Sequence, residues 1–241
     1  MGMERFFKIF EVPAAAKSVI DRIVSKEEIE LLEAVGRGSF SLDDAANALK
    51  KEGEAAPAER LDRLLRSAYR RGVIRLEDES FTKFRTGSFY DRLDVFAVTE
   101  NETYRSFPPE VRKALDKWYF DAYRKSLGDE PRPTGDRVLT LQEAFGLIDE
   151  TDRQIWLNKC DCRSLSGNCG KPVDTCLTLR SGINTLAHRG WSKPLTKEQA
   201  KQVVAKANRA GLMQTANPNG MCNCCGDCCY LFRAQRARHS E

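Results

Sequence analysis

Apolar residues recur at helical spacing in three successive segments near the start of the chain. Residues 25–36 and 41–53 each begin with a serine and close with a glycine, and residues 57–72 carry leucines on one face before a final glycine. A serine side chain caps the first amide groups of a helix, and glycine tolerates the left-handed turn that ends one. The pattern therefore predicts three helices.

Two short segments that alternate apolar and polar residues come next. Residues 73–77 and 81–85 are expected to be strands, separated by an acidic turn. Three helices followed by a hairpin are typical of a winged helix, which we predict over about residues 20–90.

The third predicted helix displays arginines opposite its leucines, where a recognition helix would contact DNA. These residues are Arg60, Arg63, Arg66, Arg70 and Arg71. Lys and Arg only balance Asp and Glu over residues 1–135, whereas a DNA-binding domain carries a clear positive excess. We therefore favour a structural or protein-docking role for this region and keep DNA as the less favoured partner.

The middle of the chain predicts a long helix and then a linker. Residues 106–128 carry two prolines near their start and place Val111, Leu115 and Trp118 on one face. Residues 128–136 are rich in proline, glycine and charge, so we place a domain boundary near Asp136. Residues 1–135 thus form the predicted winged-helix-like domain with its helical linker, and residues 136–241 form a second domain.

Helical and strand patterns alternate in the second domain. Residues 140–150 and 196–211 are expected to be helices capped by threonine, and residues 154–158 and 212–216 to be strands. Each strand leads toward a group of cysteines. These elements predict a small α+β domain.

The composition is that of a soluble globular protein. Of the 241 residues, 41% are hydrophobic and 31% are charged. No apolar run approaches the roughly 20 residues of a membrane helix, and the N-terminal segment does not fit a secretory signal. We therefore expect a cytoplasmic protein without a membrane partner, in which nine thiols would not persist as disulfides.

All nine cysteines lie in the second domain. They are Cys160, Cys162, Cys169 and Cys176, followed by Cys222, Cys224, Cys225, Cys228 and Cys229. The spacing C-x2-C-x2-C at Cys222, Cys225 and Cys228 is that of bacterial ferredoxins, although the C-x3-C-P that usually follows is absent. Two [4Fe-4S] clusters need four thiolates each, which nine cysteines can supply. The excess of Lys and Arg over residues 136–241 would offset the negative charge of two such clusters.

The spacing also suggests how the ligands are shared. One cluster would take Cys222, Cys225 and Cys228 with one upstream thiolate, and the other most of the upstream four with Cys229 or Cys224. Neighbours on a strand point to opposite faces, so Cys224 and Cys225, or Cys228 and Cys229, can serve different centres. The expected metal ligands are Cys160, Cys162, Cys169, Cys176, Cys222, Cys225, Cys228 and Cys229, with Cys224 in the same cofactor-binding set.

Zinc is the alternative metal. Pairs such as Cys225 and Cys228 have a spacing that structural zinc accepts. The doublets of adjacent cysteines are poor zinc knuckles, however, and His188 and His239 are the only histidines, expected in a loop and in the tail. We therefore favour iron–sulfur clusters, with Arg163, Lys171, Arg180 and Arg233 as the cations expected near them.

The motifs CDCRSLSGNCGKPVDTC and GMCNCCGDCCYLFR, joined by LTKEQAKQVVAKANRAGLMQT, resemble those of poorly characterised 4Fe-4S ferredoxin-type proteins of anaerobic bacteria and archaea. The segments YRRGVI and FYDRLDVF are similar to the same group, so the resemblance spans most of the chain. It implies cluster binding by the nine cysteines as a set. The predicted fold is therefore α+β, with a winged-helix-like domain followed by a small α+β ferredoxin-like iron–sulfur domain.

Three functions suit these features. Ferredoxin-like electron transfer to a partner redox enzyme ranks first, so we expect an electron carrier more than a catalyst. A cluster-based redox-sensing DNA-binding regulator ranks second. A catalyst with an open coordination site on one iron ranks third.

Overall fold

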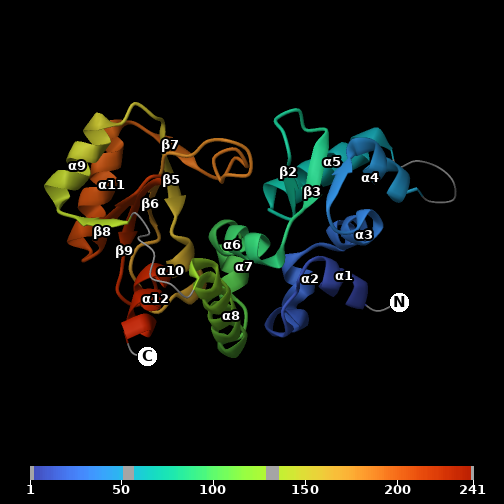
Figure 1. The fold of residues 1–241 in the computed structure, drawn as a ribbon, viewed down its shortest axis with the longest axis horizontal. Coiled ribbons are helices and arrows are strands. Elements are labelled where there is room, and N and C mark those ends of the chain that lie inside the picture. Colours follow the sequence, from blue (N-terminus) through green and yellow to red (C-terminus); the bar gives the residue numbers. More distant parts are fainter. Residues whose placement is uncertain (1–2, 51–56, 129–135, 240–241) are drawn as a thin grey trace.

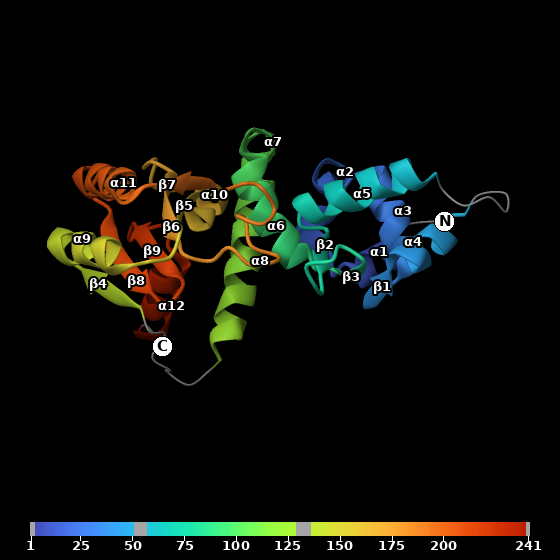
Figure 2. The same ribbon diagram turned by 90° about the horizontal axis from the view of Figure 1, so that it is seen from above.

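The computed structural model describes residues 3–50, 57–128 and 136–239 of the chain. Helices predominate, and the described residues form two antiparallel sheets near opposite ends of the molecule (Figure 1). A layer of helices stands between the two sheets, as the view from above also shows (Figure 2). The predicted α+β class is confirmed.

The N-terminal part combines helices with a three-stranded sheet of order β1-β3-β2. Capping boxes at Ser25 and Ser41 start two of the three helices predicted there, and Gly72, with a φ of 81°, ends the third. The elements in chain order are α1 (Glu4–Ile9), the 3-10 helix η1 (Ala14–Val19), α2 (Ile20–Ile23), α3 (Lys26–Val35), β1 (Ser39–Ser41), α4 (Leu42–Ala48), α5 (Ala58–Arg70), β2 (Ile74–Leu76) and β3 (Lys83–Thr86). The three predicted helices and the two predicted strands are confirmed.

A layer of three helices follows the small sheet: α6 (Phe89–Thr99), α7 (Asn101–Arg105) and α8 (Pro109–Leu127). The predicted helix over residues 106–128 is confirmed as α8, which begins at the second proline and buries Leu115. Aromatic side chains from α1, α6 and α8 fill the N-terminal core, and Leu165 and Tyr230 of the cysteine-rich region pack into the same core. The helical layer therefore joins the two ends of the molecule.

The cysteine-rich end is built on a six-stranded antiparallel sheet of order β4-β8-β9-β6-β5-β7. Helices α9 and α11 pack together over one face of the sheet, while α10 and α12 lie toward the central helices (Figures 1 and 2). The elements are β4 (Arg137–Leu139), α9 (Leu141–Glu150), β5 (Ile155–Lys159), α10 (Asp161–Ser166), β6 (Asp174–Thr178), β7 (Lys193–Leu195), α11 (Lys197–Arg209), β8 (Met213–Asn217), β9 (Gly220–Cys224) and α12 (Tyr230–His239).

Both helices and both strands predicted in this region are confirmed, and capping boxes at Thr140 and Thr196 start α9 and α11. Helix α4 ends at Ala48, short of the predicted end at residue 53. Residues 51–53 of that prediction and residues 129–135 of the predicted linker lie outside the described residues. The domain boundary near Asp136, the winged helix and the ferredoxin-like fold stay predictions. Among the described helices, none is both long and apolar enough to cross a bilayer.

Candidate metal centre

Three neighbouring strands and two short helices bring six cysteines to one place. Cys160 follows β5 as the N-cap of α10, and Cys162 lies in the first turn of that helix. Cys176 lies on β6, which is hydrogen-bonded to β5 on one side and to β9 on the other. Cys222 and Cys224 lie on β9, and Cys229 directly precedes α12. Residues more than 60 positions apart in the sequence thus meet at one end of the sheet.

The side chains of these six cysteines follow one another around one space, and we call them the six-thiol ring. The Sγ atoms of Cys229 and Cys224 are 3.6 Å apart, and the hydroxyl of Thr215 lies 3.2 Å from the Cys224 sulfur. In order around the ring the members are Cys160, Cys162, Cys229, Cys224, Cys222 and Cys176, and the last lies beside the first.

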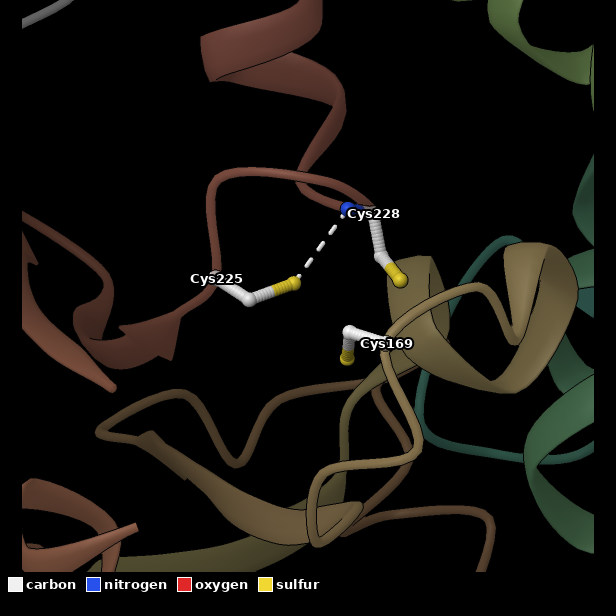
Figure 3. Close-up of side chains that lie close together, drawn as sticks. All are labelled: Cys169, Cys225 and Cys228. Carbon is white, nitrogen blue, oxygen red and sulfur yellow. Dashed lines mark hydrogen bonds between the residues drawn. The ribbon is translucent and has the colours of Figure 1, made fainter. Parts of the chain in front are cut away.

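The remaining three cysteines form a second group, the three-thiol site (Figure 3). The sulfur atoms of Cys169, Cys225 and Cys228 all lie within 4.8 Å of one another. The backbone amide of Cys228 donates a hydrogen bond of 3.2 Å to the Cys225 sulfur. The pKa of Cys225 is lowered, because this bond and others to the sulfur outweigh the effect of burial. Such amide–sulfur bonds stabilise a thiolate ready to bind a metal.

Adjacent cysteines serve different groups. Cys224 ends β9 in the ring and Cys225 follows it in the three-thiol site, and Cys229 and Cys228 are divided in the same way. Cys222 lies in the ring, apart from Cys225 and Cys228. The thiols therefore gather as six and three, which differs from the division expected from the spacing, and the assignment of cysteines to clusters stays a prediction.

Cysteines with a lowered pKa and cysteines with a raised pKa alternate around the six-thiol ring. Hydrogen bonds received from their neighbours lower the pKa of Cys160 and Cys222 well below the ordinary value and that of Cys229 to about 3. The donating neighbours Cys162 and Cys176, and with them Cys224, have their pKa raised by the same bonds. Because several negative charges meet in a buried space, the ring provides the electrostatic setting for a cation.

Arg163 lies between the two groups. Its side chain is 2% exposed and donates to the carbonyls of Pro172 and Asn223 at 2.9 and 2.7 Å and to the hydroxyl of Thr175. Burial lowers the pKa of this guanidinium, but the nearby cysteines of both groups raise it by more than burial lowers it. The net pKa is therefore raised, and the guanidinium stays charged. Of the four cations predicted near the cysteines, Arg163 is the one whose charge interacts with cysteines of both groups in the described structure, while Arg233 pairs with Asp116 and Lys171 donates to the carbonyl of Ala210.

The ring borders a cavity of about 290 Å³ whose other wall belongs to the central helices. Tyr90 of α6 stacks on Tyr119 of α8 with ring centroids 4.1 Å apart, and Tyr123 and Tyr230 complete the aromatic wall. Burial raises the pKa of Tyr90 to about 12, and the pKa of the Asp161 carboxyl is also raised by burial and nearby acids. These residues were not predicted as part of the site. The i, i+4 spacing of Tyr119 and Tyr123, which places both side chains on one face of a helix, was the sequence signal that could have indicated this aromatic wall.

The residues fit a thiolate-bound metal cofactor. All nine cysteines are free, without a disulfide between any pair. Thiolates are soft ligands that suit zinc, copper(I) and iron–sulfur clusters. His188 lies elsewhere, with its Nδ1 atom 2.7 Å from the hydroxyl of Tyr69. The described structure thus contains a sulfur-rich donor set in two parts, and a carboxylate oxygen of Asp161 lies within 4.8 Å of the sulfur atoms of Cys160 and Cys162.

Comparison with protein-family models, with curated proteins and with solved structures found no match. The resemblance to ferredoxin-type proteins therefore stays a prediction, and the assignment of function depends on the geometry of the two thiol groups.

Proposed function

We propose that this chain is an iron–sulfur protein that binds two [4Fe-4S] clusters and transfers electrons to a partner redox enzyme. The observation that carries the proposal is the convergence of all nine cysteines into two buried groups that share one guanidinium. Four of the six ring thiols would hold one cluster, and Cys169, Cys225 and Cys228 would hold the other. When bound, the clusters supply the one-electron chemistry.

The protein would contribute burial, charge and hydrogen bonds. Arg163 would stabilise the anionic form of both centres, because its charge lies beside thiolates of each. The Cys228 amide and the Thr215 hydroxyl would donate to cluster-bound sulfur and raise the reduction potential. A carrier of single electrons needs two centres close together, and the electrostatic interaction of one arginine with cysteines of both groups supports that arrangement.

The N-terminal part would serve as the docking domain for the partner. Its order of helix, strand, two helices and two strands between Lys26 and Thr86 supports the winged-helix-like assignment. We likewise assign the antiparallel sheet with helices on one face to a ferredoxin-like iron–sulfur domain.

Anaerobic purification with iron and sulfide quantitation tests the proposal. We expect about eight irons and eight sulfides per chain, with a broad visible absorption that bleaches reversibly on reduction. Zinc without sulfide would overturn it. A matched control is the variant in which Ser164, a serine on the same short helix, becomes alanine: it should load the same iron.

The second candidate is a redox-sensing regulator that binds DNA through α5. The element order supports it, but two arginines of α5 take part in other contacts: Arg60 pairs with Glu27, and Arg70 lies over the ring of Trp191 at 4.1 Å. Arg71 pairs with the buried Glu28, whereas the helical pattern predicts it among the arginines that a recognition helix would display toward DNA. A regulator would shift duplex DNA in a redox-dependent and salt-dependent way. If neither the cluster-loaded nor the cluster-free protein shifts DNA at low salt, this candidate is lost.

A further inference from the structure

The three-thiol site is one ligand short of a cubane. A [4Fe-4S] cluster is usually held by four cysteines, and the six other cysteines of the chain belong to the ring. Within the described residues, no histidine, aspartate or glutamate joins Cys169, Cys225 and Cys228 at metal-binding distance. On the side of Ala207 and Leu212 the site is apolar. The fourth ligand must therefore come from another kind of side chain or from solution.

Ser166 is placed to supply it. It is the last residue of α10, and Gly167 follows with a φ of 68°, so the chain reverses there and returns as Cys169. The Ser166 hydroxyl lies beside the Cys228 thiol, and it is buried without a hydrogen-bond partner in the described structure. A buried hydroxyl with no partner costs about 1–3 kcal/mol, so its retention calls for an explanation.

Resting on the proposed function, we infer that the oxygen of Ser166 is the fourth ligand of the cluster in the three-thiol site. On binding, the hydroxyl proton leaves to water and an iron–oxygen bond forms. The unpartnered oxygen thereby gains the partner that the protein alone does not provide. The three-thiol site then has three sulfur ligands and one oxygen ligand, whereas the six-thiol ring has more sulfur ligands than one cluster needs.

Ser164 offers a matched control on the same helix. Its hydroxyl is also buried and without a partner in the described structure, and the residue is fully buried. Two positions along a helix correspond to a rotation of about 200°, so Ser164 points away from the side that carries Ser166. Removing either hydroxyl deletes the same atom from the same helix, but only Ser166 lies beside a metal-binding thiol.

The experiment compares Ser166→Ala, Ser166→Cys and Ser164→Ala with the unchanged full-length chain, all purified anaerobically. Brief treatment with ferricyanide, which accepts the one electron released when an iron(II) ion leaves a [4Fe-4S]²⁺ cluster, is followed by iron quantitation and EPR. We expect Ser166→Ala to lose one iron per chain and to show the signal of an oxidised three-iron cluster, while Ser164→Ala behaves as the unchanged chain. Ser166→Cys, with a thiolate ligand, should keep its iron and change the EPR spectrum of one cluster after reduction.

The outcomes separate the two claims. If the unchanged chain contains no iron and sulfide, the proposed function fails and the ligand question does not arise. If it contains both clusters but Ser166→Ala retains its iron as Ser164→Ala does, and Ser166→Cys leaves the spectrum unchanged, only the assignment of Ser166 is overturned. Ser166→Cys keeps this test decisive even if Ser166→Ala folds poorly.

Discussion

Two adjacent cysteines should respond in opposite ways to the same substitution. Cys225 is one of three thiols at its site, whereas Cys224 is one of six in the ring. Replacement of Cys225 by alanine removes a ligand that no other cysteine can replace. Replacement of Cys224 leaves five ring thiols, which still exceed the four that a cubane needs.

The expected magnitude follows from this ligand count. Cys225→Ala should lower the iron content from about eight to about four per chain, because the cluster of the three-thiol site is lost while the ring cluster remains. Cys224→Ala should keep about eight irons. The visible absorption per chain should fall by about half in the first variant and stay near its original value in the second.

The assay is iron and sulfide quantitation on full-length protein purified without oxygen, with absorbance measured on the same samples. Cys228→Ala and Cys229→Ala form an independent second pair, since Cys228 lies in the three-thiol site and Cys229 in the ring. Equal iron loss in both members of each pair would refute the division into six and three. So would retention of eight irons by Cys225→Ala.

Three further predictions concern stability under matched anaerobic conditions. Arg163→Met leaves two buried carbonyls and a threonine hydroxyl without their donor, so the free energy of unfolding should fall by about 3–6 kcal/mol in urea titrations, and Arg163→Lys should recover part of it. The pKa of Asp94 is raised to about 7, chiefly by burial. Because the folded state then holds this proton more tightly than the unfolded chain, stability should decrease as pH rises from about 4 to 7, by on the order of 3 kcal/mol. Asp94→Asn should abolish that decrease, and an unchanged pH profile would contradict the assignment. Tyr230→Phe removes the hydrogen bond of 2.9 Å from the Tyr230 hydroxyl to Asp116, so the melting temperature should fall by about 2–4 °C; no change would show that the bond contributes nothing.

Local signals were sufficient for the helices with strong caps. Ser25, Ser41, Thr140 and Thr196 each start a helix where the sequence predicts one, since a capping box acts within four residues. β1 was missed because three residues are too few to show alternation, and its only sheet partner, β3, lies more than 40 positions later. Helix α6 was also missed, because most of its residues are buried and it lacks a clear polar face.

The set of cysteines was predictable, but their grouping was not. Spacing along the chain favoured joining Cys222 to Cys225 and Cys228, as in a ferredoxin loop. In the structure Cys222 lies on β9, whose pairing with β6 and β8 holds it beside Cys176 in the ring. Such pairing is a tertiary property, and so is the approach of Tyr90 and Ser166 to the two groups. No window of sequence contains that information.

The most direct test of the central claim is anomalous X-ray scattering at the iron absorption edge from crystals of oxygen-free protein. The account predicts two compact iron sites, one inside the six-thiol ring and one against Cys169, Cys225 and Cys228. Anomalous signal only at the zinc edge, or iron at neither thiol group, would contradict it.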